Sequence, residues 1–258
     1  MNCKNCNVTL APESEFCNSC GGKVIRNRLT FRNLFEHISE TFFNYDNKLL
    51  RTFIDMFRCP DQVIDSYVSG VRRRYVNPIS FFGVSLTLSG LSLFIMKKYY
   101  MQYLDYSSLF KGEIFQDPEF QEQMSNSASM SFEYSSLINS ALVPFLALVS
   151  FIVFYNRRYN LTEHIVIYLY SMSVSSILSV IFGLGVLAII PESYILFILY
   201  FYIFMLVYNS YVLTRLFKLS ALQLTLKIVL FFAIFFGFYI AIVIAVATIV
   251  IISKLIGV

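Results

Sequence analysis

From Pro78 onward, long apolar runs alternate with short polar segments. A helix needs about 20 apolar residues to cross the hydrocarbon core of a bilayer, and five runs come close to that length. The expected spans are residues 78–96, 137–155, 165–190, 194–213 and 228–253. The pattern predicts an all-α polytopic membrane domain over residues 78–258, with a long polar loop at 97–136.

Residues 23–77 are too polar to span a membrane and too regular to be a linker. Their apolar residues recur at helical spacing in three stretches, which predicts juxtamembrane amphipathic helices. The stretches are Leu34, Phe35, Ile38 and Phe42; Leu49, Leu50, Phe53, Ile54 and Phe57; and Val63, Ile64, Tyr67 and Val71. Asp46 and Asp61 are candidates to start the second and third helices. Such helices either lie on an anionic membrane surface or pack on the cytoplasmic ends of the spans.

Composition supports a membrane protein. The chain is 57% hydrophobic and only 14% charged, whereas soluble domains carry about 25% charged residues. The N-terminus is polar and contains cysteines, and it has no apolar segment of the kind found in a signal peptide.

The basic residues predict an orientation. Eleven of the 20 Lys and Arg residues precede the first span, two follow the second span, and three lie between the fourth and fifth. Sixteen therefore share one side, which the positive-inside rule places in the cytoplasm. This predicts a multi-pass protein of the bacterial inner membrane with a cytoplasmic N-terminus, an external 97–136 loop and an external C-terminus.

The first 22 residues carry two cysteine pairs, each with two residues between its members. They are Cys3 with Cys6 and Cys17 with Cys20, and Gly21 and Gly22 follow. Paired turns of this spacing are typical of a tetrahedral four-cysteine zinc site, which leaves no open position for catalysis. So short a segment cannot bury a core, so one structural Zn²⁺ would supply most of its folding energy. We therefore predict a zinc ribbon over 1–22, with disulfides, an iron–sulfur cluster and a redox motif as rival interpretations.

The ribbon lacks the charge expected of a nucleic-acid reader. Between residues 2 and 23, Lys4 and Lys23 are balanced by Glu13 and Glu15. Binding to a phosphate backbone needs clustered positive charge, so nucleic acid is not the expected partner.

Two spans carry small residues at every fourth position, which lets a neighbouring helix approach closely in lipid. The third span has Ser171, Ser175, Ser179 and Gly183, and the fifth has Ala233, Gly237, Ala241 and Ala245. We expect both ridges to pack against protein, although a serine ridge can instead line a polar path. A homo-oligomer is left open.

Candidate chemistry at the membrane is sparse. Glu163 and His164 lie at the cytoplasmic start of the third span, where they could bind a headgroup or relay a proton. The alternative is structural, with Thr162 as the N-cap and the pair at the interface. Arg72, Arg73, Arg74 and Arg157 are candidates for contact with lipid phosphate, or they simply anchor the spans.

The combined motifs resemble the bacterial domain-of-unknown-function family 3667. They are the cysteine pairs, residues 42–51, Arg58-Cys59-Pro60, the Tyr67-to-Tyr75 segment with Gly70, Arg72 and Arg74, Pro78, and Thr162-Glu163-His164. The resemblance implies a zinc ribbon on a polytopic inner-membrane protein and implies no reaction. The five-span count is also similar, more weakly, to the Yip family of membrane proteins.

Three functions remain at this point. The first is an adaptor whose ribbon and amphipathic helices bind a cytoplasmic protein or anionic lipids. The second is a carrier or channel for a small molecule or lipid, and the third is a membrane enzyme acting on a headgroup through Glu163 and His164. We favour the adaptor, without enzymatic activity, because the specific motifs are structural.

Overall fold

The computed structural model describes residues 2–22, 24, 30, 48–100, 117, 119–120, 127, 130, 134–155 and 158–256. Its contacts divide the chain into two compact units, Met1–Asn47 and Lys48–Val258. The helix expected around residues 34–42, the candidate start at Asp46, and Arg157 all lie outside the described residues.

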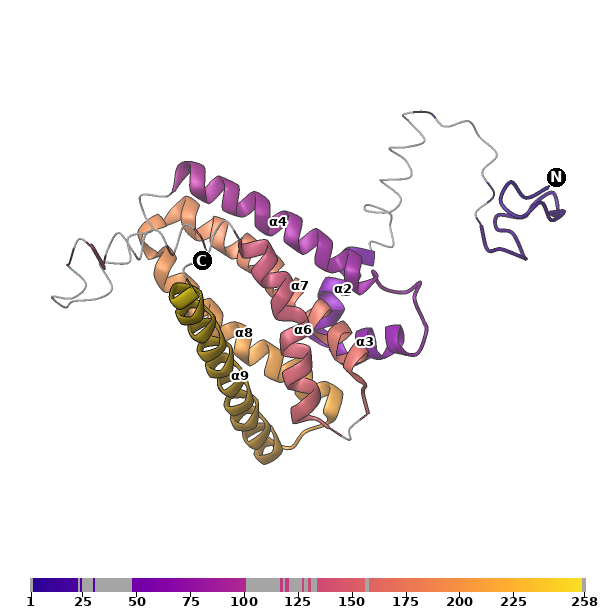
Figure 1. The fold of residues 1–258 in the computed structure, drawn as a ribbon. Helices are drawn as coiled ribbons and strands as arrows, with labels where there is room; N and C mark the ends of the chain where they lie inside the picture. Colours follow the sequence, from indigo (N-terminus) through magenta and orange to yellow (C-terminus); the bar gives the residue numbers. More distant parts are fainter. Residues whose placement is uncertain are drawn as a thin grey trace. The chain divides into compact units, whose positions relative to one another are not determined.

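The second unit is all helical in its described part (Figure 1). Among the described residues, five helices are long and apolar enough to cross a membrane, which confirms the predicted fold class. They are α4 (Pro78–Tyr99), α6 (Ser135–Val153), α7 (Leu161–Ile189), α8 (Tyr194–Phe217, preceded by the short η4, Pro191–Ser193) and α9 (Ala221–Ile256). Two shorter helices precede them, α2 (Lys48–Arg58) and α3 (Pro60–Val68), here called the juxtamembrane pair.

Local signals set the starts of the spans. The Asn77 side chain accepts a hydrogen bond from the Ile79 amide, and Pro78 occupies the first turn of α4, where its missing N–H costs nothing. At α7, Asn160 and Glu163 form a reciprocal capping box. The expected N-cap at Thr162 is therefore wrong, because α7 begins at Leu161.

Helix α7 is the centre of the second unit. It packs against α4, α6 and α8, as well as α2 and α3. Its buried face includes Ile167, Tyr170 and Val174, and these side chains belong to a core that also takes in residues of α2, α3 and α8.

The small-residue ridge of α7 faces protein. Ser171, Ser175 and Gly183 are buried, and Ser179 is half-buried. A Cβ atom at Gly183 would lie 3.3 Å from the Phe197 ring and 3.5 Å from the Tyr194 ring. The missing side chain at Gly183 thus makes room for two aromatic residues of α8.

The small-residue ridge of α9 lies on the exposed surface of the second unit. Ala233, Gly237 and Ala241 are exposed, and no atom lies within 4 Å of a Cβ placed at Gly237; the side chain of Ala245 is outside the described set. The expectation that this ridge packs against another span of the chain is wrong. The packed residues of α9 are instead mostly aromatic, and Phe235 and Phe238 lie 5.4 and 6.0 Å from the ring of Phe145 in α6.

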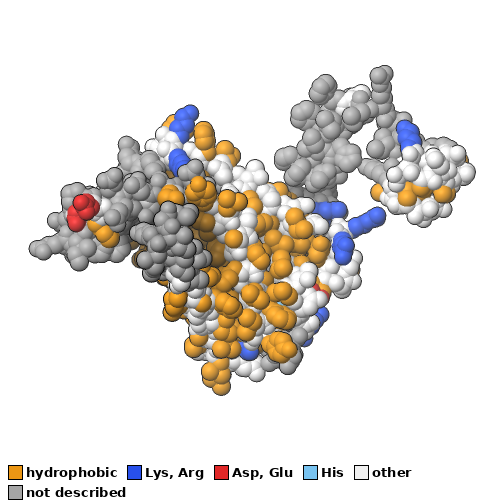
Figure 2. All heavy atoms as spheres, in the orientation of Figure 1, with side chains coloured by type: hydrophobic (Ala, Val, Ile, Leu, Met, Phe, Trp, Pro, Cys, Tyr) orange, Lys and Arg blue, Asp and Glu red, His pale blue; other side chains and the backbone are white. Residues whose placement is uncertain are grey.

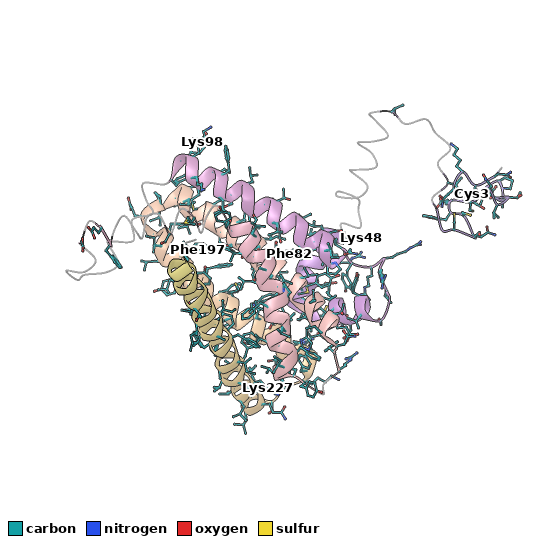
Figure 3. All side chains as sticks on the ribbon, in the orientation of Figure 1. Cys3, Lys48, Phe82, Lys98, Phe197 and Lys227 are labelled. Atoms are coloured by element: carbon teal, nitrogen blue, oxygen red, sulfur yellow. The ribbon has the colours of Figure 1, made fainter. Side chains whose placement is uncertain are left out.

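The surface of the spans suits a lipid environment. Large apolar side chains of α4, α8 and α9 are exposed, and Figure 2 shows hydrophobic side chains spread over the visible face of the second unit, with basic side chains near its margins. In Figure 3, Lys98 and Lys227 mark distant ends of α4 and α9. Exposed apolar surface of this extent is expected where acyl chains replace water.

The juxtamembrane pair packs into the bundle. Met56, Val63 and Ile64 are fully buried in the same core as the α7 residues. Two residues of the expected apolar face of α2, Leu50 and Ile54, are exposed instead, while Thr52 is fully buried and its hydroxyl oxygen accepts a hydrogen bond from the Val76 amide at 3.0 Å. The structure thus supports packing on the spans for α2 and α3.

Tyrosine hydroxyls tie α2 to α8. The last carbonyls of a helix have no partner within it, and α8 supplies partners for those of α2. Tyr208 donates to the carbonyl of Met56 at 3.3 Å, and Tyr211 donates to that of Phe57 at 2.8 Å. The C-terminus of α2 can therefore be buried against the bundle without losing its hydrogen bonds.

Two carboxylates tie α3 to the spans. Asp61, in the first turn of α3, forms an ion pair with Arg215 near the end of α8 at 3.0 Å. Asp65 pairs with Arg158 at 3.1 Å and also accepts a hydrogen bond from the Tyr159 hydroxyl. Burial and Asp65 together raise the pKa of Tyr159, which keeps this hydroxyl protonated and able to donate.

We predict that Gly183→Leu lowers the stability of the protein in detergent by about 1–3 kcal/mol, because the added side chain collides with the α8 aromatics. Gly185→Leu is the matched control, since no atom lies within 4 Å of a Cβ at that position. Thermal unfolding can compare the two variants. Equal unfolding temperatures would show that α7 and α8 do not pack through Gly183.

Candidate metal centre

The first cysteine pair lies on a tight hairpin turn. The Cys3 amide donates to the Val8 carbonyl at 2.9 Å, and the Asn7 amide donates to the Cys3 carbonyl at 2.9 Å. A short antiparallel bridge between Asn2 and Thr9 closes the base of the turn. Cys3 and Cys6 are thus held on one side of the same loop.

The second pair repeats this geometry at the same offsets. The Cys17 amide donates to the Gly22 carbonyl at 2.8 Å, and the Gly21 amide donates to the Cys17 carbonyl at 2.9 Å. Gly21 takes a positive φ of 69°, and Asn7 takes φ 58° at the equivalent place in the first turn. Asn is among the non-glycine residues that best tolerate this conformation, which explains how a turn without glycine matches one that has it.

Gly22 differs from Gly21 in the reason for having no side chain. It has no positive φ, but a Cβ atom there would lie 3.4 Å from the Cys20 sulfur. Its missing side chain keeps space around that sulfur.

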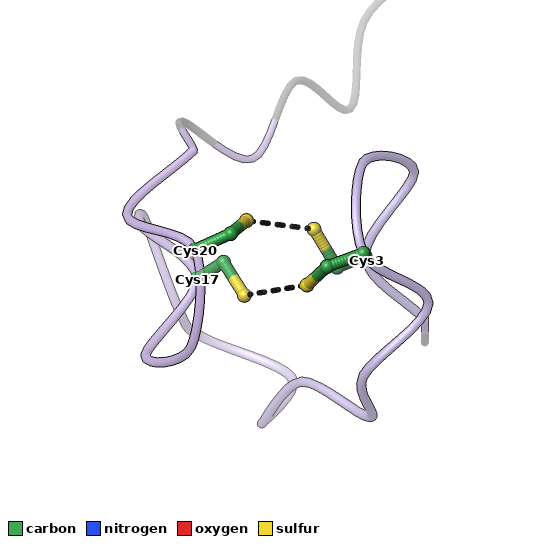
Figure 4. A group of neighbouring side chains, drawn as sticks. Cys3, Cys17 and Cys20 are labelled. Atoms are coloured by element: carbon green, nitrogen blue, oxygen red, sulfur yellow. Dashed lines mark hydrogen bonds between the residues drawn. The ribbon is translucent and has the colours of Figure 1, made fainter.

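The four sulfurs converge (Figure 4). Cys3 and Cys20 are 3.7 Å apart and Cys6 and Cys17 are 3.5 Å apart, and all four sulfur atoms lie within 4.8 Å of one another. Four sulfurs about 2.3 Å from a tetrahedral metal ion would be separated by about 3.8 Å. The cysteines are free thiols, so this donor set fits a single metal ion.

The electrostatics of the cluster also favour a cation. The Asn5 side chain and the Gly22 backbone amide lower the pKa of Cys20 to about 6. For Cys6 the Val8 amide lowers the pKa, but the neighbouring sulfurs of Cys20 and Cys17 outweigh it and raise the pKa to about 12. Four thiolates this close repel one another, and a metal ion would relieve that repulsion.

Cys59 lies in the second unit, immediately before α3. Burial and the nearby carboxylates of Asp55 and Asp61 raise the pKa of its thiol. The cluster of four sulfurs in the first unit has its full set of tetrahedral donors without Cys59.

Glu163 and His164 do not form an open site. The Glu163 carboxylate accepts a hydrogen bond from the Asn160 amide at 2.7 Å, as part of the capping box. His164 is fully buried, and its Nδ1 lies 3.0 Å from the hydroxyl oxygen of Ser150 in α6. Both residues therefore have structural partners.

Aromatic rings surround His164. Phe151, Phe154, Tyr159 and Phe217 have ring centroids between 5.8 and 6.5 Å from that of the imidazole. These rings come from α6, the segment after it, and the end of α8. His164 thus holds the ends of three spans together, and its Nε2 has no hydrogen-bond partner among the described residues.

The arginines before the first span have other neighbours. Arg72, Arg73 and Arg74 are exposed in the segment between α3 and α4. The Arg72 and Arg74 guanidinium groups lie 5.5 and 5.4 Å from the ring centroids of Tyr67 and Tyr75. Their exposure leaves them accessible to lipid phosphate.

The structure also contains a cavity that no sequence motif indicates. A cavity of about 730 Å³ lies between the cytoplasm-predicted ends of α6, α7, α8 and α9, and its lining includes Lys227. Its residues come from four separate spans at no fixed spacing, so only the packing of the spans brings them together.

Comparisons with known proteins identify one family. Residues 46–90 match the family described as "Protein of unknown function (DUF3667)". The match confirms the resemblance over α2, α3 and the first half of α4, and it does not extend to the cysteine pairs or to Glu163 and His164. Neither the curated proteins nor the solved structures gave a match.

We predict that the purified full-length protein holds one metal ion and that Cys17→Ser loses most of it, because a serine hydroxyl is a poor substitute for a buried thiolate ligand. Cys59→Ser, which changes the one cysteine outside the cluster, should keep the metal. Elemental analysis by mass spectrometry measures both. Full metal content in the Cys17→Ser protein would refute the four-sulfur site.

Proposed function

We propose that this protein, in which residues 46–90 match the DUF3667 family, is a membrane adaptor of the bacterial inner membrane. In this proposal the ribbon (residues 2–22) recruits a cytoplasmic protein, and the five spans hold it at the membrane. The observation that carries the proposal is the division of the chain into a small cysteine-built unit and a separate helical unit.

The metal of the ribbon is Zn²⁺ in this proposal. Zinc favours four thiolates in tetrahedral geometry, and a reducing cytoplasm keeps the cysteines available as ligands. Because four protein ligands fill the coordination sphere, the ion stabilises the fold and carries out no reaction.

The surface of the ribbon supports docking. Val8 and Phe16 each leave more than a third of their surface exposed on a segment of about twenty residues. Apolar side chains around a rigid metal-held loop are suited to a protein partner, whereas the ribbon lacks the clustered positive charge that nucleic-acid binding needs. Arg72, Arg73 and Arg74 add contact with anionic lipids at the membrane surface.

The alternatives have less support. An enzyme acting through Glu163 and His164 needs an accessible site, but Glu163 is engaged in a capping box and His164 is fully buried. A carrier using the serine ridge needs accessible hydroxyls along a path. Ser175 donates to the Ser171 carbonyl of its own helix at 3.0 Å. The Ser171 hydroxyl has no partner among the described residues, but it is fully buried between the helices.

The proposed orientation can be tested by labelling single cysteines. Deleting residues 2–22 and introducing Cys59→Ser removes all five native cysteines. In that background, Glu119→Cys should react only with reagent outside the cell and Ser220→Cys only from the cytoplasmic side. Labelling of both positions from the same side would overturn the orientation.

Partner recruitment can be tested by crosslinking in cells followed by mass spectrometry. The adaptor proposal expects specific protein crosslinks that disappear when residues 2–22 are deleted. They should also fall sharply in Cys17→Ser, because loss of metal unfolds the ribbon. Cys59→Ser is the control and should keep them, with abundance measured in every strain. Unchanged crosslinks after deletion of the ribbon would contradict the proposal.

A further inference from the structure

The cavity between the spans has an apolar body and one charged end. Here it is called the α8–α9 cleft. Most of its lining is aliphatic or aromatic, including Leu206, Leu213, Ile228 and Phe231. Lys227 is the one charged side chain among the described residues that line it. No described carboxylate pairs with Lys227, so the cleft has an uncompensated positive group at that end.

Lys227 is positioned by the end of α6. Its ammonium group donates to the Val153 carbonyl and lies 5.3 Å from the centroid of the Phe154 ring. An ammonium carries three N–H donors, so this contact leaves others for a ligand. The neighbouring Thr214 hydroxyl donates to the Ser210 carbonyl within α8 at 2.7 Å, and its oxygen can still accept.

The charged end lies on the same side of the membrane as the juxtamembrane pair. Tyr211 lines the cleft and also donates to the carbonyl of Phe57 in α2. Figure 3 places Lys227 near the start of α9. The positive group is therefore at the level where the headgroups of one leaflet would lie.

The cleft opens sideways toward the bilayer. Ile203, Leu206 and Val207 line it, yet each keeps half or more of its surface exposed. Helix α9 shields it incompletely, because its contacts with α8 are few and its main partner is α6. A molecule already in the bilayer can enter without crossing water.

The depth of the cleft matches one leaflet. Along α8 its lining runs from Thr214 to Ile203, eleven residues apart. At a rise of 1.5 Å per residue this is about 17 Å, close to half of the roughly 30 Å hydrocarbon core. A path through the membrane would need about twice that length.

We propose that the α8–α9 cleft binds one anionic phospholipid from the leaflet next to the juxtamembrane pair. One acyl chain occupies the apolar body, and the phosphate lies against Lys227. This site is separate from the ribbon and does not depend on the adaptor proposal. It would tie the packing of α9 to the lipid composition of that leaflet.

Native mass spectrometry of the full-length protein tests the proposal. The protein is equilibrated in detergent with phosphatidylglycerol and phosphatidylcholine of identical acyl chains. We expect one retained phosphatidylglycerol and little phosphatidylcholine. Lys227→Gln should lower phosphatidylglycerol retention about fivefold, because this is the loss expected when one lysine no longer attracts an anionic lipid. Lys227→Arg keeps the charge and should retain the lipid.

Two matched controls separate the site from general effects. Lys218→Asn removes a nearby exposed charge at a left-handed position that Asn tolerates, and it should leave retention unchanged. Leu206→Trp fills the cleft and should abolish retention, whereas Val229→Trp, at an exposed position outside the lining, should not. Because Leu206→Trp leaves Lys227 unchanged, it tests lipid binding in the cleft even where Lys227→Gln disturbs folding.

Several results would overturn the proposal. Equal retention of phosphatidylglycerol and phosphatidylcholine would show that Lys227 does not select an anionic headgroup. Retention unaffected by Leu206→Trp would place the lipid elsewhere, and absence of any retained lipid would remove the site. A dimer that forms only while the cleft is unfilled would show that a second copy occupies it.

Discussion

Polar anchoring of the juxtamembrane pair is the constraint on which the rest of the helical unit depends. Helix α2 ends with carbonyls that lack partners, and α3 carries two carboxylates into contact with the bundle. Tyr208 and Tyr211 satisfy those carbonyls, and Arg215 and Arg158 pair with Asp61 and Asp65. Unpaired carbonyls would be costly to bury, so the end of α2 can join the core because Tyr208 and Tyr211 of α8 supply partners. The two ion pairs of α3 lie at the surface and contribute less. Both Lys227 and His164 lie among the helix ends that this arrangement brings together.

Span positions were predictable because a bilayer imposes a length on apolar runs. The predicted fourth span starts at Tyr194, as α8 does, and the predicted first span starts at Pro78, as α4 does. Which face of each span packs against protein was less predictable. Small residues at four-residue spacing allow close approach but do not require it. In α7 an aromatic pair from α8 uses the space at Gly183, whereas in α9 the aromatic face of Phe235 and Phe238 packs and Gly237 faces outward.

The candidate sites also differ in how far the sequence predicts them. The cysteine cluster is local, since two short turns with equal offsets are enough to bring four sulfurs together, and the spacing alone indicates them. His164 looked accessible at the start of a span, but residues of α6, the segment after it and α8 enclose it. No local pattern reveals such enclosure. The α8–α9 cleft likewise exists only through the packing of four helices, which explains why its lysine had no motif.

Hydrogen–deuterium exchange in lipid nanodiscs tests most directly whether α2 and α3 belong to the bundle. Amides of a helix buried in the core exchange only through opening of that core, whereas a helix resting on the lipid surface opens by itself. Amides of residues 52–57 and 63–67 should exchange nearly as slowly as those at the start of α7, and Asp61→Ala with Asp65→Ala should accelerate them selectively. Rapid exchange of both segments in the unchanged protein, similar to that of residues 69–74, would contradict this account.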